Sequence, residues 1–177
     1  MPAAEVSEQI SLAGMEASGT GNMKFMMNGA LTIGTYDGAN VEINQQVGDE
    51  NMFLFGLRTE EVQRLRPSYN SRAIYNSDPE IAQAIDMIRN NVFSVLTPGL
   101  FDPIVRSLLD YNDYYMLLGD LRSYIDAQDR LDATYRNPTA WNEMSLINIA
   151  RSGLFSSDRS VAEYARDIWK VQPIKFD

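Results

Sequence analysis

The sequence predicts an α/β fold, with a small α/β part at residues 1–56 and a mostly helical part at residues 57–177. A glycine-rich turn, Gly19–Gly21, lies between two candidate strands and opens a helical run, so that these segments form a βαβ unit. From Thr59 onward, apolar residues recur at helical spacing. A length of 177 residues and a hydrophobic content of 45% fit a single domain with its own core.

The α/β part is predicted from its apolar runs and from the residues that interrupt them. Residues 8–12 alternate weakly and indicate a short strand. Thr20 is a candidate N-cap for the helix that follows, and Gly29 is its expected end. Residues 30–35 indicate a buried strand. The pair Asp37-Gly38 comes next and is, on local grounds, a hairpin signal.

The second part is predicted as a series of helices, whose starts are marked by capping residues and prolines. We expect helices to begin at or near Thr59, Ser77, Asp102, Gly119, Asn137 and Ser157. Their apolar stripes are expected to face the core, including Val161, Tyr164 and Ile168 on the last helix. Residues 66–76 are the least regular stretch and are predicted as a surface loop with one helical turn.

Composition excludes several classes of function. The net charge is −9 and there is no basic tract, which argues against nucleic acid and acidic membranes as partners. No apolar run is long enough to span a bilayer, and the first residues do not resemble a signal peptide, so we expect a cytoplasmic protein. The chain has no cysteine and no histidine, and we expect no metal site. Carboxylate, hydroxyl, amine or cofactor chemistry remains.

The turn at Gly19–Gly21 is the strongest candidate for a site. Glycines allow close backbone approach to a ligand, and the free N–H groups of a following helix favour a phosphate. Lys24 lies about one turn into that helix and could reach back over such a ligand. The other lysines, Lys170 and Lys175, do not follow a glycine-rich turn. Phe25, Met26 and Met27 are candidates for the apolar surroundings of the amine. A capped core helix with a solvent-facing lysine is an equally acceptable interpretation.

A family resemblance adds to this pattern. Residues 16–42 contain Glu-Ala-Ser-Gly-Thr-Gly-Asn-Met-Lys-Phe-Met-Met-Asn and Gly-Ala-Leu-Thr-Ile-Gly-Thr-Tyr-Asp-Gly-Ala-Asn-Val-Glu. This stretch resembles the pyridoxal-phosphate segment of the glycogen/starch (α-glucan) phosphorylases. The resemblance continues more loosely at residues 51–56, 135–138, 148–153, 155–159 and 164–169. It implies a partial Rossmann-like C-terminal lobe of a GT-B glycosyltransferase fold, at the C-terminal end of a longer enzyme.

The resemblance also implies an activity and roles for individual residues. Enzymes of this family cleave terminal α-1,4 links of a glucan with inorganic phosphate and release glucose 1-phosphate. Lys24 matches the catalytic lysine that holds pyridoxal 5'-phosphate covalently, and the phosphate of that cofactor acts on the substrate phosphate. Thr20 and Gly21 match residues that bind the cofactor phosphate. Glu16, Ser18 and Gly19 match residues that bind the sugar.

The resemblance finally settles the conflict at Asp37-Gly38 in favour of a helix. It implies a helix from near Gly38 towards Gln46, with Asp37 as its N-cap, Gly48 as its end and a last strand at residues 52–55. It implies a homodimeric parent enzyme with α-1,4-glucan and inorganic phosphate as substrates. Basic residues that bind both phosphates would lie upstream, so we expect the isolated chain to be inactive. Two alternatives are a sugar-nucleotide-binding lobe without pyridoxal phosphate and a non-catalytic structural or oligomerisation module.

Overall fold

A computed structural model describes residues 3–172 and 174. Its sheet has three parallel strands in the order β1-β2-β3, which span Val6–Gln9, Leu31–Thr35 and Phe53–Phe55. Val6 pairs with Leu31, and Ile33 pairs with Phe53. The predicted α/β class is confirmed. The first strand, however, ends at Gln9 rather than at Leu12.

Two helices connect the strands and rule out the hairpin at Asp37-Gly38. Helix α1 spans Gly21–Met27 between β1 and β2, and α2 spans Ala39–Val47 between β2 and β3. Gly48 ends α2, as expected. Parallel strands need such crossovers, since a tight turn reverses the chain and joins antiparallel strands. The central strand β2 is buried along its whole length because helices cover both of its faces.

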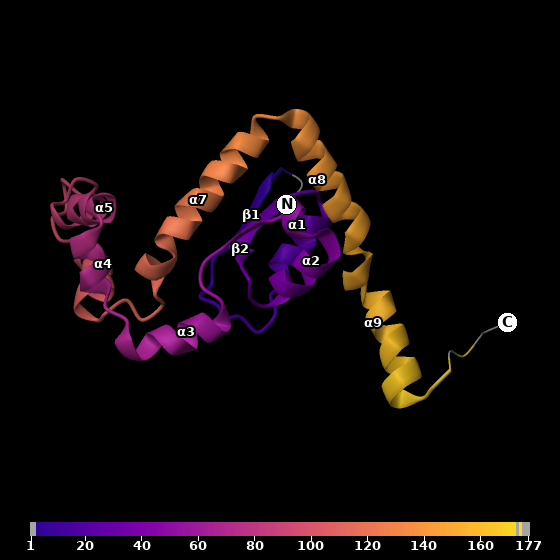
Figure 1. The fold of residues 1–177 in the computed structure, drawn as a ribbon. Helices are drawn as coiled ribbons and strands as arrows, with labels where there is room; N and C mark the ends of the chain where they lie inside the picture. Colours follow the sequence, from indigo (N-terminus) through magenta and orange to yellow (C-terminus); the bar gives the residue numbers. More distant parts are fainter. Residues whose placement is uncertain (1–2, 173, 175–177) are drawn as a thin grey trace.

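The helical part follows the sheet and also covers it. Four short helices, α3 to α6, precede the two long helices α7 and α8, and α9 follows them. Figure 1 shows α7 and α8 beside the sheet. Their bounds, in chain order, are Thr59–Leu65, Ser71–Ser77, Pro79–Arg89, Asp102–Val105, Leu117–Tyr135, Pro138–Arg151 and Ser157–Glu163. Shorter 3₁₀ or π segments lie at Asp49–Asn51, Arg66–Ser68, Arg106–Asp110, Ser152–Phe155 and Tyr164–Trp169.

Two of the core clusters pack against the sheet, one on each face, and two others lie within the helical part and the loop after β1. On one face, Ile33 and Phe53 pack with Ala127 of α7 and Trp141 of α8. On the other face, Met26 of α1 packs with residues of α2 and with Met52, which precedes β3. The sheet therefore fixes α1, and with it the glycine-rich turn, through contacts of buried side chains.

Three expectations about the helical part are wrong. Residues 66–76, predicted as a loop, form a 3₁₀ turn and α4, whereas residues 90–101 are irregular. The N-cap of α5 is Asp78 rather than Ser77, and that of α9 is Ser156 rather than Ser157. The apolar stripe of the last helix is exposed, and Figure 1 shows why: this helix extends away from the sheet, where the described residues offer no surface to cover it. Across residues 3–172 and 174, no helix combines the length and hydropathy needed to cross a membrane.

Candidate functional site

The residues proposed from the sequence lie on one loop at the carboxyl edge of the sheet. Residues 16–21 follow the carboxyl end of β1 and lead directly into α1. Glu16, Ser18, Thr20 and Lys24 are exposed, while Gly19 and Gly21 are partly buried. Ligands of parallel sheets bind at this edge. All six residues thus lie between the carboxyl end of β1 and the first turn of α1, and four of them are exposed.

The two faces of α1 explain why Lys24 points outward. Residues four apart share a helix face, and Asn22 and Met26 form the buried face. Thr20 and Lys24 share the exposed face, and Lys24 N–H donates a hydrogen bond to the carbonyl of Thr20 over 3.3 Å. Thr20 is the N-cap by position, although its side chain makes no capping bond. The expected apolar surroundings of Lys24 are wrong, because Met26 belongs to the core and Met27 is 56% exposed.

The donors at this turn are available to an anion. Within the described part of the chain, the Lys24 amine forms no ion pair, and no hydrogen bond uses the backbone N–H groups of Gly21 and Asn22. Helix α1 has only seven residues, so its dipole is small. An anion at this turn would therefore be held mainly by hydrogen bonds from the individual N–H groups. The amine and N–H donors fit an aldehyde that carries a phosphate.

A buried carboxylate, Asp37, holds the part of this loop at Met15 and Glu16 in place. Oδ2 of Asp37 accepts hydrogen bonds from the backbone N–H groups of Met15, over 3.1 Å, and of Glu16, over 2.8 Å. Asp37 follows the carboxyl end of β2, next to the loop. The sequence assigned Asp37 to capping α2, which is wrong: the N-cap is Gly38, and no side chain caps that helix.

Residues at the start of α2 also contact this loop. Ala39 N–H donates to the carbonyl of Ser18 over 2.6 Å. Gly38 has a φ of 50°, and a Cβ atom there would lie 2.5 Å from the Ser18 carbonyl oxygen, so only glycine fits. Nδ2 of Asn22 donates a hydrogen bond to Oδ1 of Asn40 over 2.9 Å, and this bond connects α1 to α2. Sequence reasoning did not identify these partners.

A hollow of about 190 Å³ adjoins the loop and brings in a distant basic residue. Ser18, Met23 and Glu42 line it together with Phe155 and Arg159 from the end of the chain. Arg159 also pairs with Glu163 and donates to the carbonyl of Leu154. The sequence signal for this residue was only its place in a stretch that resembles the phosphorylases. No cluster of three or more potential metal ligands occurs in the part of the chain that the structure describes.

Comparisons with known proteins show the family of the chain. The model of the family described as carbohydrate phosphorylase matches residues 1–171. The chain is 52% identical over 176 residues to the muscle form of glycogen phosphorylase from Bos taurus, covering 99% of this chain and 21% of that protein. It is also 52% identical over 174 residues to the muscle form from Oryctolagus cuniculus and to the brain form from Homo sapiens, covering 98% of this chain and 20% of each.

The chain thus spans about a fifth of the length of the curated relatives it matches. The matched range, residues 1–171, contains the glycine-rich turn, Lys24 and all three strands of the sheet. The chain therefore belongs to the carbohydrate phosphorylase family.

Proposed function

We propose that this chain is the C-terminal part of an α-glucan phosphorylase that holds pyridoxal 5'-phosphate on Lys24. The whole enzyme cleaves terminal α-1,4-glucosidic bonds with inorganic phosphate and releases glucose 1-phosphate. One observation carries the proposal: similarity to glycogen phosphorylases extends over nearly the whole chain. Within it, a glycine-rich turn leads into a helix whose exposed Lys24 forms no ion pair among the described residues.

Each proposed residue has a separate task. Lys24 attaches the cofactor, while Thr20 and the N–H of Gly21 hold the cofactor phosphate. When bound, pyridoxal phosphate supplies a phosphate group that acts on the substrate phosphate as an acid–base or electrostatic partner. Glu16, Ser18 and the N–H of Gly19 hold hydroxyl groups of the glucose unit, where a carboxylate can accept and a backbone N–H can donate.

The isolated chain lacks part of what this reaction needs. Two phosphates brought together repel each other, and basic groups must offset that repulsion. Around the loop, Arg159 is the basic residue that lines the adjoining hollow, and its guanidinium already pairs with Glu163. We therefore propose that the isolated chain is inactive and that the remaining phosphate-binding groups lie elsewhere in a longer polypeptide.

The same proposal covers the organisation of the protein. Residues 1–177 form one domain of a GT-B catalytic unit, with an α/β part at 1–56 and a helical part at 57–177. The complete enzyme is a cytoplasmic homodimer. Similarity to the glycogen phosphorylases and the parallel sheet support this placement.

Cofactor attachment is tested by trapping. The chain is mixed with pyridoxal phosphate, reduced with borohydride and digested, and the modified lysine is found by mass spectrometry. We expect modification at Lys24, and we expect the Lys24→Ala variant to lose most of it. Lys170→Ala is the matched control, since Lys170 is also exposed. Equal modification of Lys170 and Lys24 would contradict the proposal. Failure of this lysine to form an imine in the intact enzyme would favour a sugar-nucleotide lobe.

A further inference from the structure

Two buried asparagine side chains connect the sheet to the glycine-rich turn. Asn40 is 3% exposed, and its Nδ2 donates a hydrogen bond to the carbonyl of Thr35, the last residue of β2, over 3.0 Å. Oδ1 of Asn40 accepts the bond from Asn22. Asn22 is 2% exposed, and its own Oδ1 accepts from the backbone N–H of Met23 over 2.9 Å. The end of β2 is thus linked through two amides to the first turn of α1.

The direction of each hydrogen bond in this series is determined. A carbonyl only accepts, so Asn40 must turn its NH₂ group to Thr35 and its oxygen to Asn22. Asn22 must then turn its NH₂ group to Asn40, which leaves its oxygen for the N–H of Met23. An aspartate has the same shape, but at position 40 it would place an acceptor against the Thr35 carbonyl. Position 40 therefore requires an amide.

Two glycines make room for these amides. A Cβ atom at Gly34, in β2, would lie 2.7 Å from Nδ2 of Asn40, which is too close for two such atoms. A Cβ atom at Gly19 would lie 3.5 Å from both polar atoms of the Asn22 amide, so this amide lies against the turn. Gly19 has a φ of 83°, in the left-handed region that favours glycine. The asparagine pair thus supports the turn as well as the helix.

Asn22 provides the directional contact that orients α1. The helix has seven residues, and its buried residues are Asn22 and Met26. Met26 packs among apolar side chains, and such packing has no preferred direction, whereas a hydrogen bond weakens when its angle changes. Without the amide, α1 could rotate about its own axis. A rotation of about 20° moves a group that lies about 6 Å from the helix axis by about 2 Å.

We propose that Asn22 and Asn40 are positioning residues for Lys24. Both act through other groups: Asn40 holds Asn22 from the end of β2, and Asn22 fixes the rotation of α1 and the adjoining turn at Gly19. The inference rests on the proposed function for the cofactor that Lys24 takes. Misplacement of a reacting group by about 1 Å lowers a rate by up to about 100-fold. Selective reaction of the Lys24 amine therefore requires both amides.

The test extends the trapping experiment to these amides. Each variant is mixed with pyridoxal phosphate and reduced with borohydride, and the modification of Lys24 is divided by that of Lys170 in the same sample. We expect Asn40→Asp to lower this modification ratio about tenfold, because the Lys24 amine loses its fixed position. Asn22→Ala should lower the ratio similarly. Alanine favours helix, so this second variant decides the test if Asn40→Asp does not fold.

Two further measurements identify the mechanism. The double variant Asn22→Ala/Asn40→Asp should lower the ratio no further than the stronger single variant, because both replacements break the same bond. Amide hydrogen exchange needs no cofactor and reports on the first turn of α1, where Lys24 N–H bonds to the carbonyl of Thr20. In Asn40→Asp, we expect exchange at Lys24 to accelerate about fivefold, the size expected for the loss of one buried hydrogen bond.

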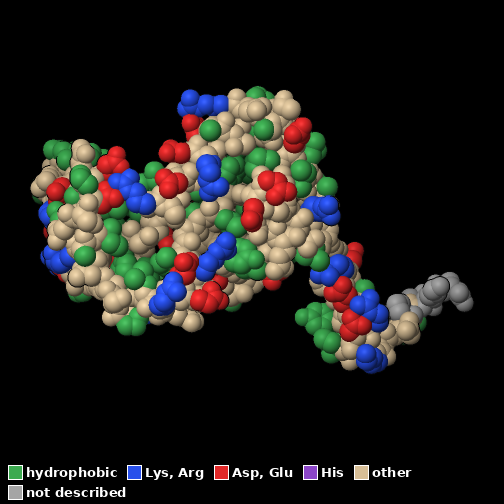
Figure 2. Space-filling view, viewed as in Figure 1, with side chains coloured by type: hydrophobic (Ala, Val, Ile, Leu, Met, Phe, Trp, Pro, Cys, Tyr) green, Lys and Arg blue, Asp and Glu red, His purple; other side chains and the backbone are tan. Residues whose placement is uncertain are grey.

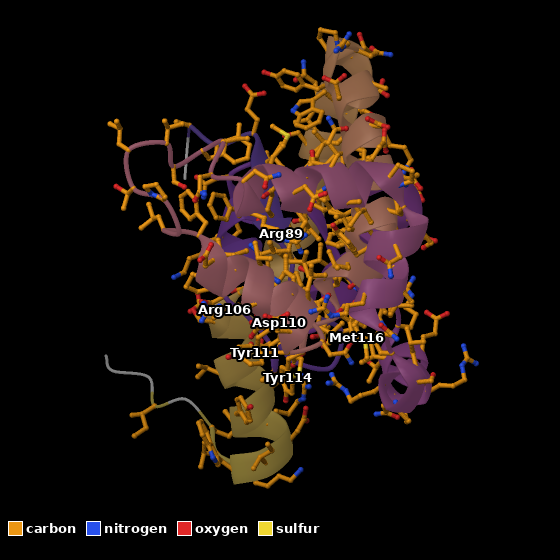
Figure 3. The ribbon with its side chains drawn as sticks, turned by 90° about the vertical axis from the view of Figure 1, so that its left-hand side faces the viewer. Arg89, Arg106, Asp110, Tyr111, Tyr114 and Met116 are labelled. Atoms are coloured by element: carbon orange, nitrogen blue, oxygen red, sulfur yellow. The ribbon has the colours of Figure 1, made fainter. Side chains whose placement is uncertain are left out.

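Two variants control for a loss of stability alone. Asn51→Asp removes the same kind of bond, because Nδ2 of the buried Asn51 donates to the carbonyl of Val47 over 2.8 Å. Tyr75→Phe removes a hydroxyl of α4 that donates to Oδ1 of Asp86 over 2.8 Å. In Figure 1, α7 separates α4 and α5 from α1, and Figure 3 shows Arg89 of α5 on that side of the molecule. Both controls should lower Tm and keep the modification ratio of the wild type.

The outcomes distinguish this inference from the proposed function. Where the wild type is selective for Lys24, an unchanged ratio in folded Asn40→Asp and Asn22→Ala overturns the inference. An equal fall of the ratio in Asn51→Asp overturns it too, since stability alone would then explain the effect. A wild-type ratio near one contradicts the proposed function, and the positioning role is then decided by exchange at Lys24, which must accelerate in Asn40→Asp.

Discussion

At the scale of single residues, Asp37 joins two distant parts of the candidate site. Its Oδ2 atom accepts two backbone N–H groups from a loop that lies more than twenty residues earlier in the chain. Glu16 is thereby held at the carboxyl edge of the sheet, next to the turn that leads to Lys24. A hydrogen bond to an ionised group contributes more to stability than a neutral one, and removing the acceptor leaves the donors without a partner.

Replacement of Asp37 tests this role. We expect Asp37→Ala to lower the free energy of unfolding by about 2 kcal/mol, because the N–H groups of Met15 and Glu16 lose a charged acceptor. Urea denaturation measures the loss, and amide hydrogen exchange should accelerate at Met15 and Glu16. Asp129→Ala on α7 is the control, since Asp129 is exposed. Unchanged exchange at Met15 and Glu16 would show that Asp37 does not fix the loop.

The site was predictable in part from local sequence. Lys24 and Thr20 share an exposed helix face because of helical periodicity alone. The partners of Asp37 were not predictable in this way, because an Asp before a glycine at a helix start fits a local N-cap equally well. Only the parallel pairing of β1 with β2 brings Asp37 to the loop after β1, and that pairing depends on contacts between distant residues.

At the scale of elements, a charged contact joins α5 to α7. Asp78 caps α5 by accepting the N–H groups of Glu80 and Ile81, and its carboxylate also pairs with Arg122 of α7. Arg122 contacts Glu80 as well. The hydrogen bond from Arg122 lowers the pKa of Asp78 from 3.8 to about 2. The folded state thus favours the ionised carboxylate.

This contact predicts a pH dependence. Because the pKa of Asp78 is depressed on folding, its contribution is complete above about pH 4 and disappears as the pH falls towards 2. We expect Arg122→Gln to lower Tm at pH 7, and the difference from wild type to shrink between pH 4 and pH 2. Arg136→Gln is the control, because its pair with Asp132 is highly exposed and should contribute little. A difference in Tm that is constant from pH 7 to pH 2 would contradict this assignment.

Most element types were predictable, and the errors have physical causes. The βαβ unit and the long helices α7 and α8 follow from apolar periodicity and breakers. Residues 66–76 contain Pro67 and several polar residues, yet they form α4 because Asn70 caps it and Ile74 packs against neighbouring clusters. Periodicity also predicted that the stripe on the last helix is buried. A pattern shows that a face is apolar, but it does not show whether this chain supplies the surface that covers it.

At the scale of the whole molecule, the last helix stands apart from the body. Figure 2 shows hydrophobic side chains gathered on one side of this projecting arm. Val161, Tyr164, Ile168 and Trp169 are 50–62% exposed. Four large apolar side chains on one helical segment are typical of a contact surface. In a solution that contains only this chain, a second copy of the chain can cover the stripe. We therefore expect association through the last helix.

Deletion of the last helix tests whether its apolar stripe serves the fold of one chain or association between chains. We expect a chain that ends at Ser156 to melt within about 3 °C of the full chain, because the described contacts of residues 157–172 are mostly local and leave the sheet core intact. Light scattering coupled to size exclusion should show that the full chain associates as its concentration rises and that the shortened chain does so less. The variant V161K/I168K keeps the arm but places charges on its stripe, and it should behave like the shortened chain. A large fall in Tm on truncation would contradict this expectation. It would mean that residues 157–172 stabilise the fold of a single chain and do not act only in association between copies.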